Sequence, residues 1–390
     1  MPSFEPFPGI RYAPGLDPSI VTSPPYDVID GRERAELASS HPANAVHVDC
    51  PVGDLGGGGA GTGGGSDPYG EAATTFQRWL DDGTLVVDER PSFTLYRMSF
   101  TDEAGRHRST TGVIGALRLE RPGEGDVLPH ERTTPKAKSD RLDLLRATQA
   151  NLSAVWGLSL AAGLSKLLDP PGEALADWTD ADAVRHQAWR LDDAEACARI
   201  TETVAGAPVV IADGHHRYET CLAYRDEVGD DVPGSDATLC LVVELAEEQL
   251  TVRPIHRLVS GLPDGFDLLS ALSSTYTVEP VDAVVPDELG VVTASGSARL
   301  RPLVDDGTLD TVRLDEAFAA LPSHEVAFQH GHGAVLAAVA DGRADAGVLL
   351  RPVTVGQIAA VAEARDRMPP KTTFFSPKPR TGVVFRSLSA

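Results

Sequence analysis

The spacing of apolar residues along the chain predicts a mixture of strands and helices. Alternation of apolar and polar residues predicts a strand over residues 92–100, and the run GVIGALRLE predicts another over 112–120. Helical spacing predicts helices over 71–80 and 140–150, and Asp140 is expected to cap the second of them. The first part of the chain is therefore expected to combine both kinds of element.

The remainder of the chain continues the same mixture. The apolar run APVVIA at 207–212 predicts a buried strand that leads directly into a helix. Two apolar segments, 239–245 and 250–259, predict a hairpin. A strand, a helix and a closing strand are expected over 344–353, 355–367 and 381–385. Because strands and helices mix without a regular βαβ rhythm, we expect an α+β fold, or an irregular α/β fold, with mixed sheets.

One segment interrupts these elements. Nine of the 14 residues at 53–66 are glycine, which predicts a flexible surface loop. With 390 residues the chain is long enough for two or three domains. We expect an N-terminal α/β region over 1–160 that carries this loop and a C-terminal α/β region over 161–390. A single composite unit is the alternative.

Composition then narrows the classes of partner. The chain has 34 basic and 57 acidic residues, a formal charge of −23, which disfavours binding to nucleic acid or to an anionic membrane surface. No apolar run approaches the roughly 18 residues of a membrane helix, and the N-terminus lacks the features of a signal peptide. Four scattered cysteines predict neither a disulfide framework nor a structural metal site. We therefore expect a cytoplasmic protein whose partners are small molecules; its oligomeric state stays open.

The strongest chemical signal is the turn that follows the predicted strand at 207–212. Asp213-Gly214-His215-His216-Arg217 places a glycine, two histidines and an arginine where a helix begins. Free backbone N–H groups at a helix N-terminus bind anions, and a guanidinium suits phosphate. Histidines there can act as acid or base near neutral pH. The sequence therefore predicts a phosphate-binding turn, and an ordinary capped strand-to-helix turn is the alternative.

Two further segments concentrate cations in this acidic chain. The first, PHERTTPKAKSDR, and the second, MPPKTTFFSPKPRTG, together contain four of the five lysines. They supply His130, Glu131, Arg132, Thr133, Lys136 and Arg141 from the first, and Lys371, Lys378 and Arg380 from the second, as candidate phosphate or nucleotide ligands, with Glu131 as a candidate catalytic carboxylate. A solvated loop and a docked C-terminal tail are the alternative interpretations.

Two smaller motifs add candidates. Asp27, in the PPYDVI motif at 24–29, is expected to act as a general base or as a metal-side ligand, or else as a stabiliser of its own turn. His256 ends a predicted strand between two arginines and is expected to line the same pocket. His330 and His332 have the spacing of a metal pair without an evident third ligand, so no metal site is assigned.

Six ordered motifs resemble a known family. They are PPYDVI, PHERTTPKAKSDRLDLLRAT, ANLS, IADGHHRYETCLAY, IHRLV and MPPKTTFFSPKPRTGVVF, and they span nearly the whole chain. Together they resemble the prokaryotic domain-of-unknown-function family ten-fifteen. The name of that family implies no activity.

The DGHHR turn by itself is similar to the phosphate-binding turn of the ParB/sulfiredoxin superfamily. Gly214 and Arg217 match the glycine and arginine of that turn, and His216 matches the histidine of its sulfiredoxin form. His215 stands in the place of the catalytic cysteine of sulfiredoxin, so sulfinic-acid reduction is not implied. ADP-dependent free-serine kinases have a closely similar DGHHR. The resemblance implies a strand–turn–helix core that binds nucleotide.

These features favour a nucleotide-dependent phosphotransferase that acts on a small hydroxylated metabolite, with free serine as a candidate. ATP or ADP is the expected phosphoryl donor, and Mg²⁺ is compatible with the many oxygen ligands. The phosphates are expected on the 214–217 backbone, Arg217, and Lys136 or Lys378. Glu131, Asp27 and Asp213 stay open as the carboxylate that takes the hydroxyl proton.

Two other functions fit the same residues. One is a phosphate-ester hydrolase that uses His215 or His216 as nucleophile or as acid and base. The other is a regulatory protein that binds a nucleotide or a phosphorylated metabolite without turnover. All of these require the motifs to converge, so we expect His130, Lys136, Arg217, His256 and Lys378 to line one cleft.

Overall fold

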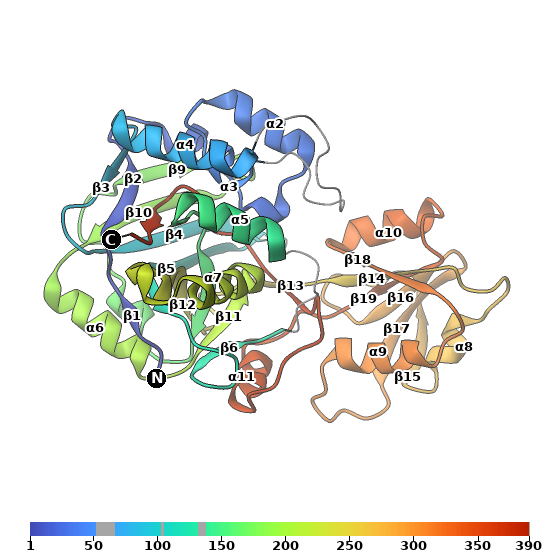
Figure 1. Ribbon diagram of the computed structural model, residues 1–390. Coiled ribbons are helices and arrows are strands. Elements are labelled where there is room, and N and C mark those ends of the chain that lie inside the picture. The colour runs from blue at the N-terminus through green and yellow to red at the C-terminus, as the bar shows by residue number, and fades with distance from the viewer. Residues whose placement is uncertain (52–66, 103–104, 132–137, 390) are drawn as a thin grey trace. The chain divides into compact units, whose positions relative to one another are not determined.

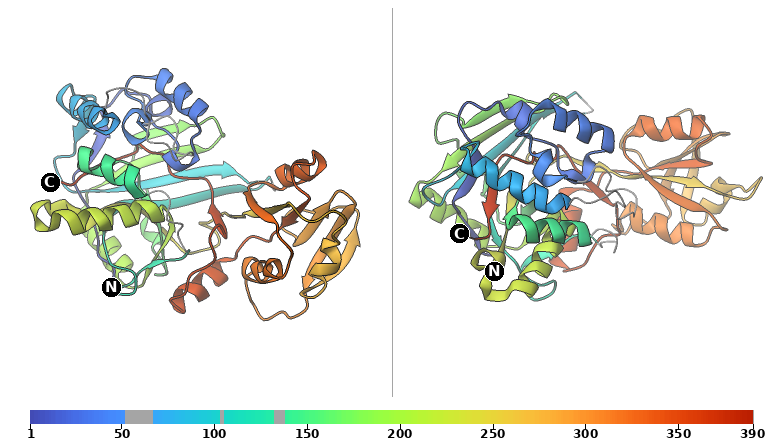
Figure 2. Two further views of the ribbon diagram at one scale, coloured as in Figure 1. Left: turned by 45° about the vertical axis from the view of Figure 1, so that its right-hand side comes forward. Right: turned by 45° about the horizontal axis from the view of Figure 1, so that its top comes forward.

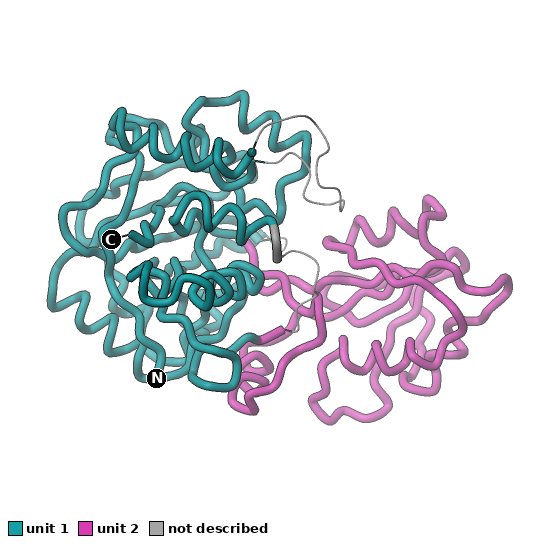
Figure 3. Tube along the Cα trace, viewed as in Figure 1, with its two compact units in different colours: residues 1–129, 133–251, 377–390 teal, residues 130–132, 252–376 magenta. Residues whose placement is uncertain are grey.

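A computed structural model describes residues 1–51, 67–102, 105–131 and 138–389 (Figure 1). The predicted loop at 53–66 and the candidates Arg132, Thr133 and Lys136 therefore lie outside the described residues. The chain forms two compact units (Figure 3). Unit 1 comprises Met1–Pro129, Thr133–Thr251 and Pro377–Ala390, and unit 2 comprises His130–Arg132 and Val252–Ser376. The division at residue 160 stays a prediction.

A large mixed sheet forms the centre of unit 1. Its nine described strands run in the order β6-β11-β8-β12-β5-β4-β10-β9, with β1 paired to β5. The pairs β6–β11 and β8–β12 are parallel, and the other pairs are antiparallel. The strands are β1 (Phe4–Glu5), β4 (Phe93–Thr101), β5 (His107–Arg118), β6 (Val127–Pro129), β8 (Val155–Ser159), β9 (Ala176–Thr179), β10 (Arg185–Leu191), β11 (Val209–Asp213) and β12 (Ala237–Glu244).

Three helices pack against this sheet: α5 (Lys138–Thr148), α6 (Ala194–Ala205) and α7 (His215–Val228). Helices α5 and α7 lie side by side in every view (Figures 1 and 2). Their apolar side chains share one buried cluster with strand residues such as Val209 and Val242. Burial of this cluster removes a large apolar area from water. This hydrophobic packing holds the start of α7 against the end of β11.

A smaller antiparallel sheet in unit 1 joins segments from distant parts of the chain. Its order is β3 (Leu85–Val87), β2 (Gly9–Tyr12), β21 (Phe385–Ser387) and β7 (Ala150–Asn151). Helix α4 (Pro68–Asp81) covers it through Phe76 and Trp79, which pack with Phe385. The other short elements of unit 1 are α1 (Pro18–Val21), η1 (Tyr26–Val28), α2 (Gly31–Ser40), α3 (Val46–Asp49), η3 (Ser165–Leu167), η4 (Gly229–Asp231) and η5 (Pro233–Asp236).

Unit 2 has its own sheet and its own core. Six described strands pair in the order β15-β17-β16-β19-β14-β18, and every pair is antiparallel. Strands β13 and β20 form a separate two-stranded sheet. The elements are β13 (Val252–Pro254), β14 (His256–Ser260), α8 (Leu268–Leu272), β15 (Tyr276–Val281), β16 (Gly290–Thr293), β17 (Gly296–Pro302), α9 (Asp310–Ala319), β18 (Glu325–Gln329), α10 (His332–Ala340), β19 (Ala346–Leu349), α11 (Val355–Glu363) and β20 (Thr373–Phe375).

The mixed α/β fold class predicted from the sequence is confirmed. The predicted hairpin of residues 239–245 and 250–259 is wrong, because β12 pairs with β5 and β8 whereas β13 pairs with β20. Asp140 is not a helix cap: it lies inside the first turn of α5, where it accepts a hydrogen bond from the Tyr69 hydroxyl. The closing strand begins at Phe385 rather than at residue 381. None of the described helices combines the length and the apolar character that a membrane crossing requires.

Candidate functional site

The DGHHR turn connects strand β11 to helix α7 in unit 1. Asp213 is the last residue of β11, and His215 is the first residue of α7. Gly214, between them, has a φ of 83°, a left-handed conformation that glycine adopts without steric cost. The N-cap residue is Gly214 itself, which has no side chain that could cap the helix, and backbone N–H groups at a helix N-terminus can bind an anion.

Gly214 is also constrained by a close contact. A Cβ atom at this position would lie 2.8 Å from Arg217 Nε and 2.9 Å from Arg217 Cζ. The guanidinium cannot move aside freely, because it is bonded to Asp213 and to the carbonyl of Ala154. The turn therefore needs glycine for two separate reasons.

Replacing Gly214 with alanine is therefore expected to destabilise the protein by about 2 kcal/mol, from left-handed strain of about 1 kcal/mol plus displacement of Arg217. Gly83, which follows α4, is the matched control, because its φ of 78° is close to that of Gly214 but a Cβ there meets nothing within 4 Å. Urea unfolding of Gly214→Ala and Gly83→Ala measures the difference. Equal losses would show that the contact with Arg217 costs nothing.

Four charged side chains meet at the turn, and we call them the turn cluster: Asp27, Asp213, Arg217 and Lys378. Asp213 accepts hydrogen bonds from Lys378 Nζ at 2.8 Å and from Arg217 Nη2 at 2.7 Å, each on a different carboxylate oxygen. Lys378 Nζ also donates to Asp27 Oδ2 at 3.2 Å, and Arg217 Nη2 lies 3.8 Å from the same oxygen. Two carboxylates thus face two cations, and their formal charges cancel.

Burial and ion pairing compete in this cluster. Burial opposes ionisation of Asp213, but Lys378 and Arg217 outweigh it and lower the pKa of its carboxyl to about 2. Burial likewise opposes the charge on Arg217, and Asp27 and Asp213 raise its pKa above the ordinary value. Lys378 behaves in the same way, with Asp213 and Asp27 raising its pKa. The cations at the turn therefore keep their charge across the physiological range.

Two segments from opposite ends of the chain bring Asp27 and Lys378 to the turn. Asp27 lies in the short helix η1, after Pro24 and Pro25, and Lys378 lies in the C-terminal segment of unit 1. The two segments are joined by backbone hydrogen bonds in both directions between Ser23 and Thr381, at 3.1 and 2.8 Å. The PPYDVI and SPKPRTG motifs are therefore neighbours in space although about 350 residues separate them.

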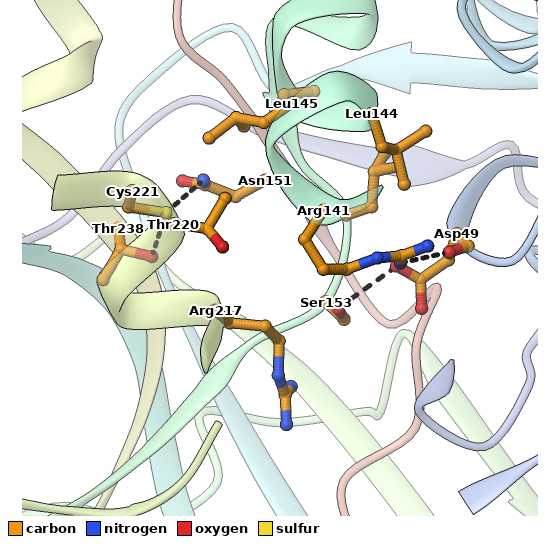
Figure 4. A pocket seen from close by; sticks show the side chains of 12 residues that line it. Asp49, Arg141, Leu144, Leu145, Asn151, Ser153, Arg217, Thr220, Cys221 and Thr238 are labelled. Carbon is orange, nitrogen blue, oxygen red and sulfur yellow. Dashed lines mark hydrogen bonds and ion pairs between the residues drawn. The ribbon is translucent and has the colours of Figure 1, made fainter. Parts of the chain in front are cut away.

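A small cavity lies beside Arg217 (Figure 4). Arg217 reaches it from α7 and Arg141 from α5, and Asp49 lies at its far side, where it accepts a hydrogen bond from Ser153 at 3.2 Å. Burial raises the pKa of Asp49 although Arg141 opposes it. The volume of about 50 Å³ has room for a few water molecules but not for a nucleotide.

Sequence reasoning missed Asp49, Asn151, Ser153 and Thr220 as cavity-lining residues. The ANLS segment at 150–153 was the available signal for two of them, because it is one of the six motifs. Asp49 follows a largely apolar segment and Thr220 lies inside a predicted helix, so neither gives such a signal. Arg141 was predicted as a phosphate ligand; in the structure its guanidinium lies 4.1 Å from the centre of the Tyr26 ring and pairs with Asp140 at 2.7 Å.

The other candidates lie in several places. His215 and His216 form the first turn of α7, beside the turn cluster. Arg380 donates to the carbonyl of Thr22 at 3.3 Å and lies 3.7 Å from Asp180 in unit 1.

Four of the described candidates belong to unit 2: His130, Glu131, His256 and Lys371. His130 Nε2 lies 2.7 Å from the Thr373 hydroxyl, and both carboxylate oxygens of Glu131 accept backbone N–H groups, from Lys371 and Thr372. His256 accepts a hydrogen bond from the Leu350 amide, and burial lowers its pKa to about 4. The turn thus brings Arg217 and Lys378 together, while one cleft that also includes His130, Lys136 and His256 stays a prediction.

The carboxylates of the turn cluster are the groups to consider as ligands for Mg²⁺. Among the described residues, no group of three or more histidine, cysteine or acidic side chains is arranged to hold a metal ion. Asp27 and Asp213 nevertheless converge on a single ammonium group, within 3.2 and 2.8 Å. Mg²⁺ in nucleotide sites typically takes one or two carboxylates and completes its coordination with phosphate oxygens and water. Both carboxylates are already engaged by Lys378, so the turn cluster offers Mg²⁺ no unengaged carboxylate pair, and the ion would be held mainly by the phosphates of the nucleotide.

Comparison with known proteins gives one clear match and several distant ones. The family model described as "Protein of unknown function (DUF1015)" matches residues 4–321. None of the curated proteins compared with the chain matches it.

Among solved structures, a C-terminally truncated SbnI from Staphylococcus aureus is 13% identical, with a TM-score of 0.40 over 69% of this chain and 85% of that one. A conserved hypothetical protein from Pyrococcus furiosus is 14% identical, with a TM-score of 0.37 over 67% and 92%. A free serine kinase in complex with AMP is 13% identical, with a TM-score of 0.35 over 64% and 83%. These similarities are too distant to assign a role to any residue.

Proposed function

We propose that this chain, which belongs to the family described as Protein of unknown function (DUF1015), transfers a phosphoryl group from a nucleotide to a small hydroxylated metabolite at the DGHHR turn. One observation carries the proposal. Two cations and two carboxylates converge at the N-terminus of α7, where backbone N–H groups add further anion-binding capacity. Phosphoryl transfer needs this combination of positioned cations and a proton acceptor.

Each member of the turn cluster has a separate part in the proposed reaction. Lys378 and the first N–H groups of α7 bind the phosphates, and Asp213 holds Lys378 and Arg217 in place. The hydroxyl oxygen of the acceptor forms a bond to the terminal phosphorus, and the bond from that phosphorus to the nucleotide oxygen breaks. The hydroxyl proton passes to Asp27. Mg²⁺, when bound with the nucleotide, supplies additional positive charge to the phosphates.

Of the three carboxylates that the sequence left open, Asp27 is best placed to accept a proton. Both oxygens of Asp213 are engaged by cations, and both oxygens of Glu131 accept backbone N–H groups in unit 2. Only Oδ2 of Asp27 contacts the cations, and no described residue donates a hydrogen bond to its Oδ1. Asp27 is also the most exposed carboxylate of the turn cluster, with 32% of its side chain accessible against 20% for Asp213.

The first test is nucleotide binding, measured as thermal stabilisation by ATP and by ADP, each with and without Mg²⁺. A ligand at 100 times its Kd is expected to stabilise the wild type by about 2.7 kcal/mol. Because the formal charges of the turn cluster cancel, the phosphates would add uncompensated negative charge, so we expect binding without Mg²⁺ to be roughly tenfold weaker.

The variant Lys378→Gln is expected to lose this stabilisation, because it removes the ammonium without much loss of volume. Lys166→Gln is the matched control, since Lys166 is an exposed lysine of η3. Equal nucleotide responses in the two variants would rule out the turn cluster as the phosphate site.

Turnover separates catalysis from binding alone. The similarity of the DGHHR turn to that of free-serine kinases makes serine the first acceptor to assay. A phosphorylated acceptor that appears at the rate of nucleotide consumption supports the phosphotransferase. Stabilisation by nucleotide with no turnover across a panel of hydroxylated metabolites would favour a nucleotide-binding regulatory protein instead.

A further inference from the structure

A buried chain of hydrogen bonds in unit 1 links the large sheet to the segment that carries Lys378. Tyr96 on β4 and His186 on β10 are diagonal neighbours across paired strands, and the Tyr96 hydroxyl lies 2.7 Å from His186 Nδ1. His186 Nε2 lies 2.9 Å from Asp180 Oδ2, and the backbone N–H of Arg380 donates to the Tyr96 hydroxyl at 3.3 Å. We call Tyr96, His186 and Asp180 the buried relay.

With a neutral His186 the relay has one direction. The Arg380 N–H donates to the Tyr96 oxygen, and the Tyr96 O–H donates to the unprotonated Nδ1 of His186. The Asp180 carboxylate accepts, so the imidazole proton lies on Nε2. All of these bonds form together only while the imidazole of His186 is neutral.

The surroundings of His186 favour that neutral form. Tyr96 and His186 are both fully buried, and the Trp178 ring stacks on the imidazole with centroids 4.9 Å apart. Burial lowers the pKa of His186, and Asp180 opposes this only in part. Burial also opposes ionisation of Asp180, but its hydrogen bond from His186 and that from the Val184 amide outweigh it and lower the pKa of Asp180.

The segment held by the relay is the one that positions the turn cluster. Arg380 is two residues beyond Lys378, and its neighbour Thr381 forms the backbone bridge to Ser23. Ser23 is four residues before Asp27. The relay therefore anchors the backbone that delivers Lys378, and through the bridge it also supports the segment that delivers Asp27.

We propose that the buried relay is a pH-sensitive positioning device, which holds Lys378 at the turn cluster while His186 is neutral and loosens that segment when His186 gains a proton. A protonated imidazole no longer accepts from the Tyr96 hydroxyl, which then meets two donors, the Arg380 amide and Nδ1–H. The charged and titratable groups that face it are Asp180, Arg380 and Tyr96, with Glu33 of α2 and Asp182 facing Arg380 in turn. This deepens the proposed function, because it rests on Lys378 binding phosphate.

The test is amide hydrogen exchange, which needs no nucleotide and no activity. In Tyr96→Phe the ring stays and only the hydroxyl is lost, so we expect the protection factor of the Arg380 amide at pH 7.5 to fall about three- to tenfold, the worth of one hydrogen bond. The control amide is that of Leu388, which lies in the same C-terminal segment and donates to the Gln149 carbonyl at 2.9 Å. Its protection should be unchanged.

Measuring exchange of the Arg380 amide over a pH series separates a pH-sensitive role of the buried relay from a merely structural one. The wild-type protection factor of Arg380 should fall as pH drops below about 6.5, the ordinary pKa of histidine, because the loosened form binds the proton better. His186→Gln offers the same donor and acceptor without a titratable proton, so it should keep the protection and lose the pH dependence.

Several outcomes would overturn the positioning proposal. The first is an Arg380 amide that is protected as strongly in Tyr96→Phe as in the wild type. The second is a wild-type protection factor that does not change with pH. The third is a pH profile in His186→Gln that is identical to that of the wild type. If the exchange results are as expected and no nucleotide stabilises the wild type, the relay stands and the phosphotransferase proposal fails. If nucleotide binds through Lys378 and the exchange is unaffected by Tyr96→Phe, the relay proposal alone fails.

Discussion

Replacing Asp213 with asparagine is expected to lower the free energy of unfolding by about 3–5 kcal/mol, the usual loss when one partner of a buried ion pair is removed. Asp213 is the shared acceptor of Lys378 and Arg217, which are 12% and 8% accessible. An asparagine amide would turn a donor toward one of these two cations and leave both cations of the turn cluster to share one carboxylate, that of Asp27. Urea unfolding and calorimetry at pH 7 measure the loss.

Asp177→Asn provides the matched control for that prediction. Asp177 also accepts hydrogen bonds from an arginine, Arg185, but the pair is exposed, so we expect a loss of no more than about 1 kcal/mol. A similar small loss in Asp213→Asn would contradict the view that the turn cluster is held by buried ion pairing.

The pH dependence of the Asp213 effect follows from the direction of its pKa. The pKa is about 2 in the folded protein and higher in the unfolded chain, so the carboxylate stabilises the fold above about pH 4. This contribution is lost as pH falls from about 4 to about 2. The difference between wild type and Asp213→Asn should therefore narrow over that range, and a constant difference would assign the loss to something other than the charge.

Asp27→Asn is expected to reduce kcat of the proposed phosphotransfer by about 10²- to 10⁴-fold, the typical contribution of a general base. An asparagine keeps the size of the side chain and can still accept from Lys378, but it cannot take the proton of the acceptor hydroxyl. Nucleotide affinity and thermal stability should change little, because Asp27 is the more exposed carboxylate of the turn cluster. Steady-state kinetics and nucleotide titration on the same preparation test both parts.

Two further variants sharpen the Asp27 experiment. Glu36→Gln, at an exposed position of α2 paired only with Arg32 among the described residues, should leave kcat unchanged. Glu131→Gln addresses the competing assignment of the base. If Glu131→Gln abolishes turnover and Asp27→Asn does not, Glu131 is the base and the role given to Asp27 is wrong.

Local pattern predicted the turn well because everything it depends on lies within a few residues. The apolar run before Asp213, the glycine, and the helical spacing after it are contiguous, and the structure forms β11 and α7 as expected, joined by Gly214. Arg217 could be chosen as a ligand candidate for the same reason. The presence of a cation-rich C-terminal motif with Lys378 was equally visible in the sequence.

Pairing between strands could not be predicted in the same way. The apolar spacing of β12 is compatible with any neighbour, and the polar connection at Glu247-Glu248 predicts a hairpin with the next apolar segment. The structure instead pairs β12 with β5 and β8, and the paired residues lie more than 80 positions apart along the chain. Side-chain pattern reports which face of a strand is buried but carries little information about which strand covers its edge.

The sequence by itself determined the mixed fold class, the DGHHR turn and the residue types that make it suited to an anion. These properties follow from local backbone preference and from the chemistry of single side chains. Tertiary structure alone decided that Asp27 and Lys378, from opposite ends of the chain, meet at Asp213 and Arg217, and that Tyr96, His186 and Asp180 support them. Such meetings depend on the collective packing of distant segments, whose energy is shared among many residues and leaves no signal in the spacing of any one motif.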